Sequence, residues 1–146
     1  MNIASYLLPK AEVSFLRDNM TLRQGLEKLH RSGYTAIPVV DTEDRYVGVV
    51  SEGDFLWNIL AQNESLEGIT RKKMEHMTVR DILQNGKVRA VCIDTSMEQL
   101  IEQAQNQNFV PVVDDRSVFI GIVTRRDVIM YFKKKLENSR KGVDKT

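Results

Sequence analysis

Eight residues in the first half of the chain, Tyr34-Thr35-Ala36-Ile37-Pro38-Val39-Val40-Asp41, decide the fold because they recur in the second half. The second copy is Gln107-Asn108-Phe109-Val110-Pro111-Val112-Val113-Asp114, and its proline follows the first by 73 positions. At the same spacing, Tyr46-Val47-Gly48-Val49-Val50-Ser51-Glu52-Gly53-Asp54 recurs as Phe119-Ile120-Gly121-Ile122-Val123-Thr124-Arg125-Arg126-Asp127. Self-similarity at one fixed spacing is the sequence signature of a duplicated structural unit. The chain therefore contains two copies of one unit.

A helix is predicted before each proline-containing strand. Apolar residues at i, i+4 and i+7 form one face of such a helix, and they are Leu22, Leu26 and Leu29 in the first copy and Met97, Ile101 and Ala104 in the second. Thr21 and Ser96 stand where an N-cap is needed, and Gly33 stands where the first helix should stop.

Strands and a second helix complete each unit. Two short β-branched runs, Val39-Val40 and Val112-Val113, end at an aspartate, and the segments at 46–50 and 119–123 are nearly continuous in apolar residues. Further strands are expected at 12–16 and 88–93, and the pattern turns helical after Ser51 and Thr124. Each unit is thus strand-helix-strand-strand-helix, so the fold class is α/β (α+β). We expect the first domain at 9–62, a connection at 63–76, the second domain at 77–134 and a charged C-terminal tail at 135–146.

The composition excludes several classes of protein. The chain has 146 residues, 28% of them charged, and a net charge of +1, which gives no argument for a nucleic-acid partner. Its single cysteine, Cys92, rules out an internal disulfide framework and suits a reducing compartment. No run approaches the ~18 apolar residues of a membrane span, and the first residues lack the pattern of a signal peptide. We therefore expect a cytoplasmic protein with no membrane partner.

The two copies resemble the cystathionine-beta-synthase (CBS) domain pair, also called a Bateman module. Three stretches are similar to small bacterial proteins that consist of little beyond one such pair: Leu8-Pro9-Lys10, Gly33-Tyr34-Thr35-Ala36-Ile37-Pro38 and Thr124-Arg125-Arg126. Some members of that group bind cyclic di-AMP and regulate partner proteins. The resemblance implies tandem β-α-β-β-α CBS repeats in a pseudo-twofold Bateman module, two clefts between the repeats where adenosine ligands lie, and a disc-shaped homodimer.

The resemblance also implies the residues of each cleft. The first, nucleotide-binding cleft would use Val13, Ser14, Phe15, Thr35, Ala36 and Pro38 from the first repeat with Thr124, Arg125, Arg126 and Asp127 from the second. The second cleft would use Ala90, Asn108, Phe109 and Pro111 from the second repeat with Ser51, Glu52 and Asp54 from the first.

Physical chemistry supports a nucleotide role for the hydroxyl and carboxyl residues of these sets. Ser51 and Thr124 stand at strand-to-helix junctions, where free N–H groups attract phosphate. Asp54 and Asp127 follow three residues later, and a carboxylate can accept hydrogen bonds from both hydroxyls of a ribose. The same pairs also match a capping box, which serves only the helix, so both interpretations stay open.

The two repeats differ in charge at this point. Arginine binds phosphate through two parallel hydrogen bonds, so Arg125 and Arg126 predict that the cleft at Thr124–Asp127 is the stronger phosphate site. The alternative is that both arginines are simply solvated on the first helical turn. Gly48 and Gly121 are expected to let the backbone come close to a ligand.

The favoured hypothesis is a regulatory sensor of an adenine nucleotide, namely AMP, ADP, ATP or cyclic di-AMP, that signals to a partner protein. Neither a catalytic constellation nor a phosphate-binding loop motif is present, so we expect no enzyme and no cofactor beyond the regulatory ligand. His30 and His76 stand apart from other ligand types, so no metal site is expected. The alternative hypothesis is a structural dimerisation or interaction module that binds no ligand.

Apolar residues on two helices support the homodimer. They are Phe55, Leu56, Trp57, Ile129, Met130 and Phe132, and a single pair has little else to cover them. Trp57 is expected in the core or in this interface and not as a base-stacking residue. The cluster Lys133-Lys134-Lys135 suits the C-terminal end of a helix and is weak support for nucleic-acid contact.

Overall fold

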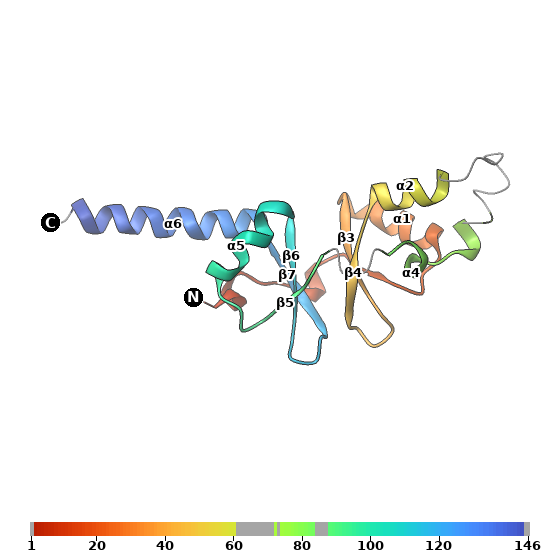
Figure 1. Ribbon diagram of the computed structural model, residues 1–146, viewed down its shortest axis with the longest axis horizontal. Coiled ribbons are helices and arrows are strands. Elements are labelled where there is room, and N and C mark those ends of the chain that lie inside the picture. The colour runs from red at the N-terminus through yellow and green to blue at the C-terminus, as the bar shows by residue number, and fades with distance from the viewer. Residues whose placement is uncertain (1, 61–71, 73, 84–87, 145–146) are drawn as a thin grey trace.

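The computed structural model describes residues 2–60, 72, 74–83 and 88–144, and it shows two small β-sheets with helices packed on them (Figure 1). The strands are β1 (Leu8–Pro9), β2 (Leu16–Arg17), β3 (Ala36–Val40), β4 (Tyr46–Ser51), β5 (Val91–Cys92), β6 (Phe109–Val113) and β7 (Phe119–Thr124). The helices are α1 (Leu22–Ser32), α2 (Glu52–Leu60), α4 (Val79–Ile82), α5 (Met97–Asn106) and α6 (Arg125–Asp144), with 3-10 turns η1 (Ile3–Tyr6) and η2 (Lys10–Glu12). The expected α/β fold class is confirmed.

The internal repeat is reproduced in the pairing of the strands. One sheet has the order β2-β3-β4 and the other β1-β7-β6-β5. Pro38 lies opposite Val49 in the first sheet, and Pro111 lies opposite Ile122 in the second. Each sheet also has a register shift at the same position of its proline strand, after Val39 and after Val112. The two copies therefore share one structure down to this irregularity.

The predicted helix signals are confirmed in both repeats. The hydroxyl of Thr21 accepts a hydrogen bond from the N–H of Gln24, whose side chain accepts one in return, and Ser96 forms the same capping box with Gln99. Gly33 ends α1 with a φ of 73°, a left-handed conformation that glycine adopts without a steric cost.

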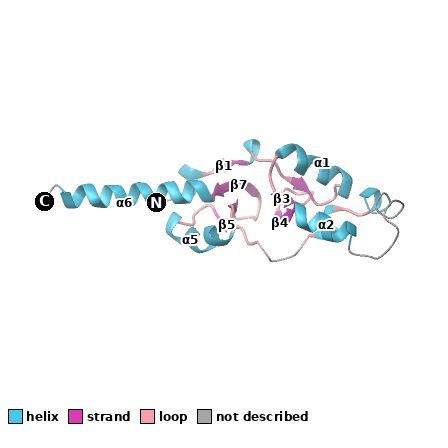
Figure 2. Cartoon of the chain, turned by 90° about the horizontal axis from the view of Figure 1, so that it is seen from above, coloured by secondary structure: helices cyan, strands magenta, loops and turns pink. Residues whose placement is uncertain are grey.

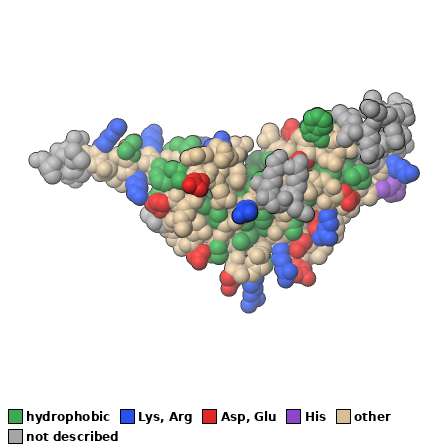
Figure 3. Space-filling view, in the orientation of Figure 1, with side chains coloured by type: hydrophobic (Ala, Val, Ile, Leu, Met, Phe, Trp, Pro, Cys, Tyr) green, Lys and Arg blue, Asp and Glu red, His purple; other side chains and the backbone are tan. Residues whose placement is uncertain are grey.

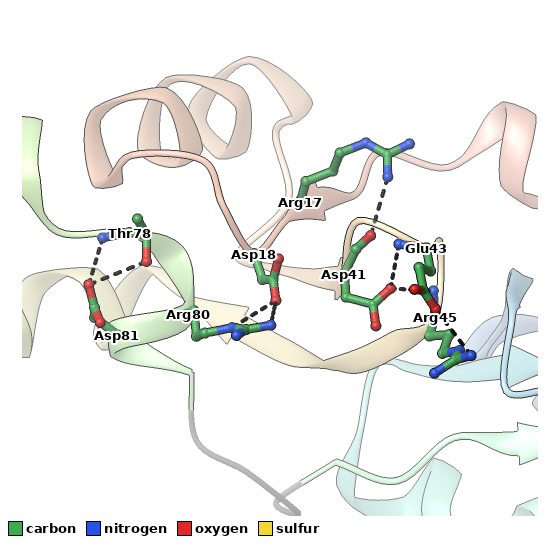
Figure 4. A network of polar contacts seen from close by, with 8 residues as sticks. All are labelled: Arg17, Asp18, Asp41, Glu43, Arg45, Thr78, Arg80 and Asp81. Carbon is green, nitrogen blue, oxygen red and sulfur yellow. Dashed lines mark hydrogen bonds and ion pairs between the residues drawn. The ribbon is translucent and has the colours of Figure 1, made fainter.

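The turns of the two hairpins hold the repeats together at one end of the module. A carboxylate oxygen of Asp41 accepts the N–H groups of Glu43 and Arg45, which closes the first turn (Figure 4). Asp114 closes the second turn in the same way. The turns then bond to each other, from the N–H of Tyr46 to the carbonyl of Ser117 at 3.1 Å and from Phe119 to Asp44 at 2.9 Å.

The segment before each repeat packs on the other repeat. Strand β1 pairs with β7, and Ile3 lies fully buried in the core of the second repeat. In the opposite direction, Val79 and Ile82 of α4 lie in the core of the first repeat. Residues 2–9 are therefore part of the second structural unit, although they precede the first repeat in the chain.

An ion pair fastens α4 to the first repeat. The side chain of Asp18 is only 3% exposed, and its carboxylate accepts two hydrogen bonds from the guanidinium of Arg80, at 2.9 and 2.6 Å (Figure 4). A further backbone bond runs from the N–H of Arg80 to the carbonyl of Asp18. A buried carboxylate requires such a partner, because burial without one is costly.

The strand that opens each repeat is shorter than expected. The predicted strand at 12–16 is reduced to β2 at 16–17, because η2 folds the chain back and the N–H of Val13 bonds to the carbonyl of Lys10. The strand predicted at 88–93 is likewise limited to β5 at 91–92, the two residues that pair with β6.

Helix α6 continues through the predicted C-terminal tail as far as Asp144 and projects away from the two sheets (Figure 2). Most of the connection predicted at 63–76 lies outside the described residues. Within the described ranges, no helix has both the length and the apolar character that crossing a membrane requires.

Candidate functional site

A cavity of about 220 Å³ lies between the two repeats at the end opposite the hairpin turns. Its lining comprises Ala36, Val49, Ser51 and Asp54 from the first repeat and Val88, Asn106, Gln107, Asn108 and Phe109 from the second. Four residues assigned to the second cleft are brought together here: Ser51, Asp54, Asn108 and Phe109. Ala36, assigned to the first cleft, also lines it. This cavity is the candidate site.

The walls of the cavity are placed by the ends of strands and helices. Ser51 ends β4 and Asp54 lies in the first turn of α2, while Phe109 begins β6 just after the end of α5. A backbone hydrogen bond of 2.9 Å from the N–H of Glu52 to the carbonyl of Thr35 fixes the start of α2 beside the proline strand. The polar groups therefore stand on regular structure and not on a loose loop.

The carboxylate of Asp54 is held against Ser51 by a complete capping box. One carboxylate oxygen accepts the N–H of Ser51 at 2.8 Å and its hydroxyl at 3.1 Å, and the N–H of Asp54 returns a bond of 3.2 Å to that hydroxyl. The capping interpretation is thus correct for this pair. Both side chains line the cavity as well, so capping fixes the carboxylate in place at its wall.

The corresponding pair in the second repeat has a different environment. The N–H of Asp127 bonds to the hydroxyl of Thr124 at 3.2 Å, the only one of the three capping contacts described for this pair. Asp127 lines a separate cavity of about 250 Å³ whose other walls come from Ser5–Leu8. None of the first-repeat residues assigned to the first cleft lines that cavity.

The residues expected to hold a base in the first cleft are packed in the contact between the repeats. Val13 is buried in a cluster with Phe119, and the ring of Phe15 lies 5.9 Å from that of Phe119. The ammonium groups of Lys10 and Lys28 lie 5.2 and 5.0 Å from the centre of the Phe15 ring. Burial lowers the pKa of Lys28, and nearby arginines lower it further. Phe15 therefore faces cations and another ring.

The remaining assigned residues lie in varied positions. Ser14 and Ala90 are half-buried, Thr35 and Glu52 are exposed, and Pro38 and Pro111 are buried inside β3 and β6. Apart from Ala36, none of the first-cleft residues lines the 220 Å³ cavity, and Ala90, Pro111 and Glu52 of the second set do not line it either.

The two arginines differ in their contacts. The guanidinium of Arg125 donates hydrogen bonds to the carbonyls of Ala104 and Gln105 in the last turn of α5, at 2.7 and 3.1 Å. It thereby satisfies helix-end carbonyls that have no partner within the helix. Arg126 is exposed to solvent.

The glycines expected beside a ligand are instead crowded by the chain itself. A Cβ on Gly121 would lie 2.2 Å from the carbonyl oxygen of Leu8, and one on Gly48 would lie 2.8 Å from a methyl group of Leu83. Both glycines therefore make room for the crossed segments that precede the repeats. Crowding by the chain itself explains the two glycines, and ligand contact at these positions stays a prediction.

Sequence reasoning missed several cavity residues. Val88 and Asn106 line the cavity and lie outside the repeated stretches. Val49 and Gln107 lie within those stretches but were assigned to neither cleft. Tyr46 was missed as well: its hydroxyl donates a 2.6 Å hydrogen bond to the carbonyl of Val88. The sequence offered one signal for a special role of Tyr46, namely that the corresponding position of the second repeat holds Phe119, which has no hydroxyl group.

Apolar side chains are exposed on the helices of both repeats (Figure 3). A groove of about 440 Å³ between α5 and α6 is lined mainly by apolar groups, including Ile101, Ile129 and Phe132. Trp57 on α2 is 74% exposed, so a place in the core of the chain is excluded. In the part of the chain that the structure describes, no group of three or more His, Cys, Asp or Glu residues could hold a metal ion.

Comparison with known proteins agrees with this geometry. The CBS domain matches the chain twice, at residues 5–61 and 77–134. Cyclic di-AMP receptor B of Bacillus subtilis (strain 168) is 28% identical over 139 residues, which cover 95% of this chain and 91% of the receptor. The Listeria monocytogenes protein CbpB, solved in complex with c-di-AMP, is 27% identical with a TM-score of 0.77 over 92% of this chain and 97% of that one.

Two further relatives differ in how much of their own length this chain covers. A hypothetical conserved protein from Geobacillus kaustophilus has 30% identity and a TM-score of 0.79, covering 92% of this chain and 98% of its own. Inosine-5'-monophosphate dehydrogenase of Escherichia coli (strain K12) is 30% identical over 107 residues, but these cover 73% of this chain and only 20% of that enzyme. With both repeats matched and the sheets, crossed segments and inter-repeat cavity in place, the chain belongs to the CBS domain family and carries two CBS domains in tandem.

Proposed function

We propose that this protein is a regulatory sensor that binds an adenine nucleotide in the cavity between its CBS domains and acts on a partner protein. The candidate ligands are AMP, ADP, ATP and cyclic di-AMP. The observation that carries the proposal is the meeting of Ser51 and Asp54 from one repeat with Asn108 and Phe109 from the other around one cavity.

The lining suits the nucleoside part of such a ligand. Val49, Val88 and Phe109 offer apolar surface for the faces of a base, and the amide of Asn108 can both donate to and accept from a base edge. Asp54 is a hydrogen-bond acceptor for ribose hydroxyls, and its capping bonds keep it ordered before the ligand arrives. Preorganisation of this kind favours affinity because less has to be ordered on binding.

The volume of the cavity indicates how much of the ligand it would enclose. About 220 Å³ lies below the roughly 300–1,000 Å³ of pockets that enclose a drug-sized ligand. The cavity therefore fits one adenosine better than a whole dinucleotide. The acidic first turn of α2, with Glu52 and Asp54, disfavours phosphate there, so the phosphates would extend outward.

A second, phosphate-binding role for the cleft at Thr124–Asp127 stays a prediction. Arg126 is exposed and available to a phosphate, whereas Arg125 would have to leave the carbonyls of α5. The Bacillus and Listeria relatives support a dinucleotide ligand, since the first is a cyclic di-AMP receptor and the second was solved in complex with c-di-AMP.

Regulation follows from the position of the cavity between two repeats. A ligand that touches both can stabilise one relative arrangement of them, provided that it binds that arrangement more tightly than the alternative. Exposed apolar side chains on α2 and α6 support a homodimer as the signalling form. We assign no catalytic activity or catalytic cofactor, because the likeness to the dehydrogenase is confined to a fifth of that enzyme. We place the protein in the cytoplasm, where the thiol of Cys92 would stay reduced.

Titration calorimetry with the four nucleotides tests the proposal. We expect at least one of them to bind the wild-type protein and to bind Asp54→Asn at least tenfold more weakly. Asp127→Asn is the matched control at the corresponding position of the other repeat, and it should retain the affinity of the nucleoside site. If none of the four nucleotides binds the folded wild-type protein, the proposal is wrong.

The ligand-free interaction module is a second candidate, favoured by the apolar groove between α5 and α6 and by the exposed Trp57. It predicts that Trp57→Ala with Ile129→Ala abolishes self-association in sedimentation, and that nucleotides change neither association nor melting temperature. A nucleotide-dependent rise in melting temperature would exclude this candidate, since a ligand that binds only the folded state stabilises it.

A further inference from the structure

Tyr46 connects the two repeats through the hydroxyl group of its half-buried side chain. Its oxygen donates a hydrogen bond of 2.6 Å to the backbone carbonyl of Val88, a residue 42 positions later in the chain. Its ring stacks on that of Phe119 at 6.4 Å, with 29° between the ring planes. Burial raises the pKa of Tyr46, which keeps the hydroxyl protonated and able to donate at any physiological pH.

The accepting residue is part of the candidate site. Val88 lines the 220 Å³ cavity and leads into β5, the strand that opens the second repeat. β5 itself has only two residues, Val91 and Cys92, paired with β6, so few ladder bonds hold this part of the wall. The hydrogen bond from Tyr46 reaches Val88 from the first repeat. It adds to the short pairing between β5 and β6 in holding Val88 in place.

The bond is specific to one repeat. Phe119 occupies the position that corresponds to Tyr46 in the second repeat, and it carries no hydroxyl group. Val13 stands three residues before Leu16 of β2, as Val88 stands three residues before Val91 of β5. A hydrogen bond from the second repeat to Val13, equivalent to that from Tyr46 to Val88, therefore cannot form. The two rings stack on each other, but only that of Tyr46 carries a hydroxyl group that can bond to the wall of a cleft.

We infer that Tyr46 is a positioning residue that holds the Val88 wall in its ligand-ready position, so that the cavity at Ser51 and Asp54 is preformed. This inference rests on the nucleotide-binding function proposed above. Without the hydroxyl, the carbonyl of Val88 loses this hydrogen bond. Val88 then also samples positions in which its side chain does not line the cavity. Apparent affinity falls in proportion to the population of the competent state.

Tyr46→Phe tests the inference because it removes the hydroxyl and keeps the ring. We expect it to bind the nucleotide that the wild type prefers about 5- to 30-fold more weakly, the equivalent of losing one hydrogen bond. Tyr131→Phe is the matched control. It removes another tyrosine hydrogen bond of 2.6 Å, to Glu98 between α5 and α6, and should leave affinity unchanged.

The reactivity of Cys92 supplies a measurement that needs no nucleotide. This thiol is the only one in the chain, and it lies four residues after Val88. We expect an aromatic disulfide reagent to modify Cys92 several-fold faster in Tyr46→Phe than in the wild type, and at the wild-type rate in Tyr131→Phe. Added nucleotide should slow modification of the wild type.

The outcomes separate the two proposals. If the wild type binds a nucleotide and Tyr46→Phe binds it equally well, the inference is overturned while the proposed function stands. Equal losses of affinity in both tyrosine variants would reduce Tyr46 to a general stabilising role and also overturn it. If the wild type binds none of the four nucleotides, the proposed function fails and the positioning role fails with it.

Discussion

Substitution of Gly121 by alanine tests the crossing of the N-terminal segment onto the second repeat. The new Cβ would lie 2.2 Å from the carbonyl oxygen of Leu8 and 2.9 Å from a methyl group of Leu7. The carbonyl belongs to the backbone of β1, so no change of side-chain rotamer relieves the contact. Strand β1 would have to move away from β7 and give up the pairs at Ile122 and Gly121.

The corresponding substitution, Gly48→Ala, is the control. Gly48 and Gly121 have nearly the same φ, 157° and 155°, so the backbone cost of adding a Cβ is similar and cancels in the comparison. The closest atom to the new Cβ at Gly48 is a methyl group of Leu83 at 2.8 Å, which can rotate away. The two variants therefore differ mainly in what opposes the new methyl group.

Gly121→Ala should lower the free energy of unfolding by about 2–3 kcal/mol more than Gly48→Ala does. This figure combines overpacking against a rigid neighbour, about 1–3 kcal/mol, with about 1 kcal/mol for each ladder hydrogen bond that is lost. For a protein of this size it corresponds to a melting temperature lower by about 4–12 °C, measurable by circular dichroism or calorimetry. Equal melting temperatures for the two variants would refute the close approach of Leu8 to Gly121, and with it the crossed arrangement.

Two other predictions concern charged contacts. Hydrogen bonds from Tyr131 and then Lys135 lower the pKa of Glu98 from 4.5 to about 2, so they stabilise the fold above pH 4.5 and the stabilisation disappears as the pH falls towards 2. The difference in melting temperature between wild type and Glu98→Gln should therefore close over that range, and a difference that is independent of pH would contradict this. For Asp18 and Arg80, a double-mutant cycle with Asp18→Asn and Arg80→Ala can be measured by urea unfolding. The coupling free energy should be about 1–3 kcal/mol, as for a charged, hydrogen-bonded pair. A coupling free energy near zero would mean that the contact contributes no more than an exposed ion pair.

The sequence predicts the repeated parts of this fold well because each depends on local physics. The proline strands, the hairpin after each of them and the capped helices repeat at one spacing, and each is stabilised by contacts within a few residues. Thr21 and Ser96 cap their helices as expected for that reason. The meeting of Ser51 with Asn108 was implied by the resemblance to the CBS domain pair and not by local physics.

The remaining features depend on contacts between distant segments. Ile3 and Val79 look like ordinary apolar residues in short segments, and nothing in their spacing shows that each packs on the other repeat. Arg125 resembles a phosphate ligand by residue type, but its guanidinium is used by the end of α5. Asp127 matches Asp54 in sequence, yet the N-terminal segment lies beside it because β1 follows the edge of β7.

An amide chemical-shift titration tests the central claim, which is that one adenosine lies between the repeats. Isotope-labelled protein would be titrated with the nucleotide that shows the highest affinity, and shifts would be mapped by residue. The account predicts that the largest changes cluster at Ala36, Ser51, Asp54, Asn108 and Phe109, on both repeats at once. Saturable changes that instead concentrate along α6 or at the hairpin turns, with those five amides unmoved, would contradict it.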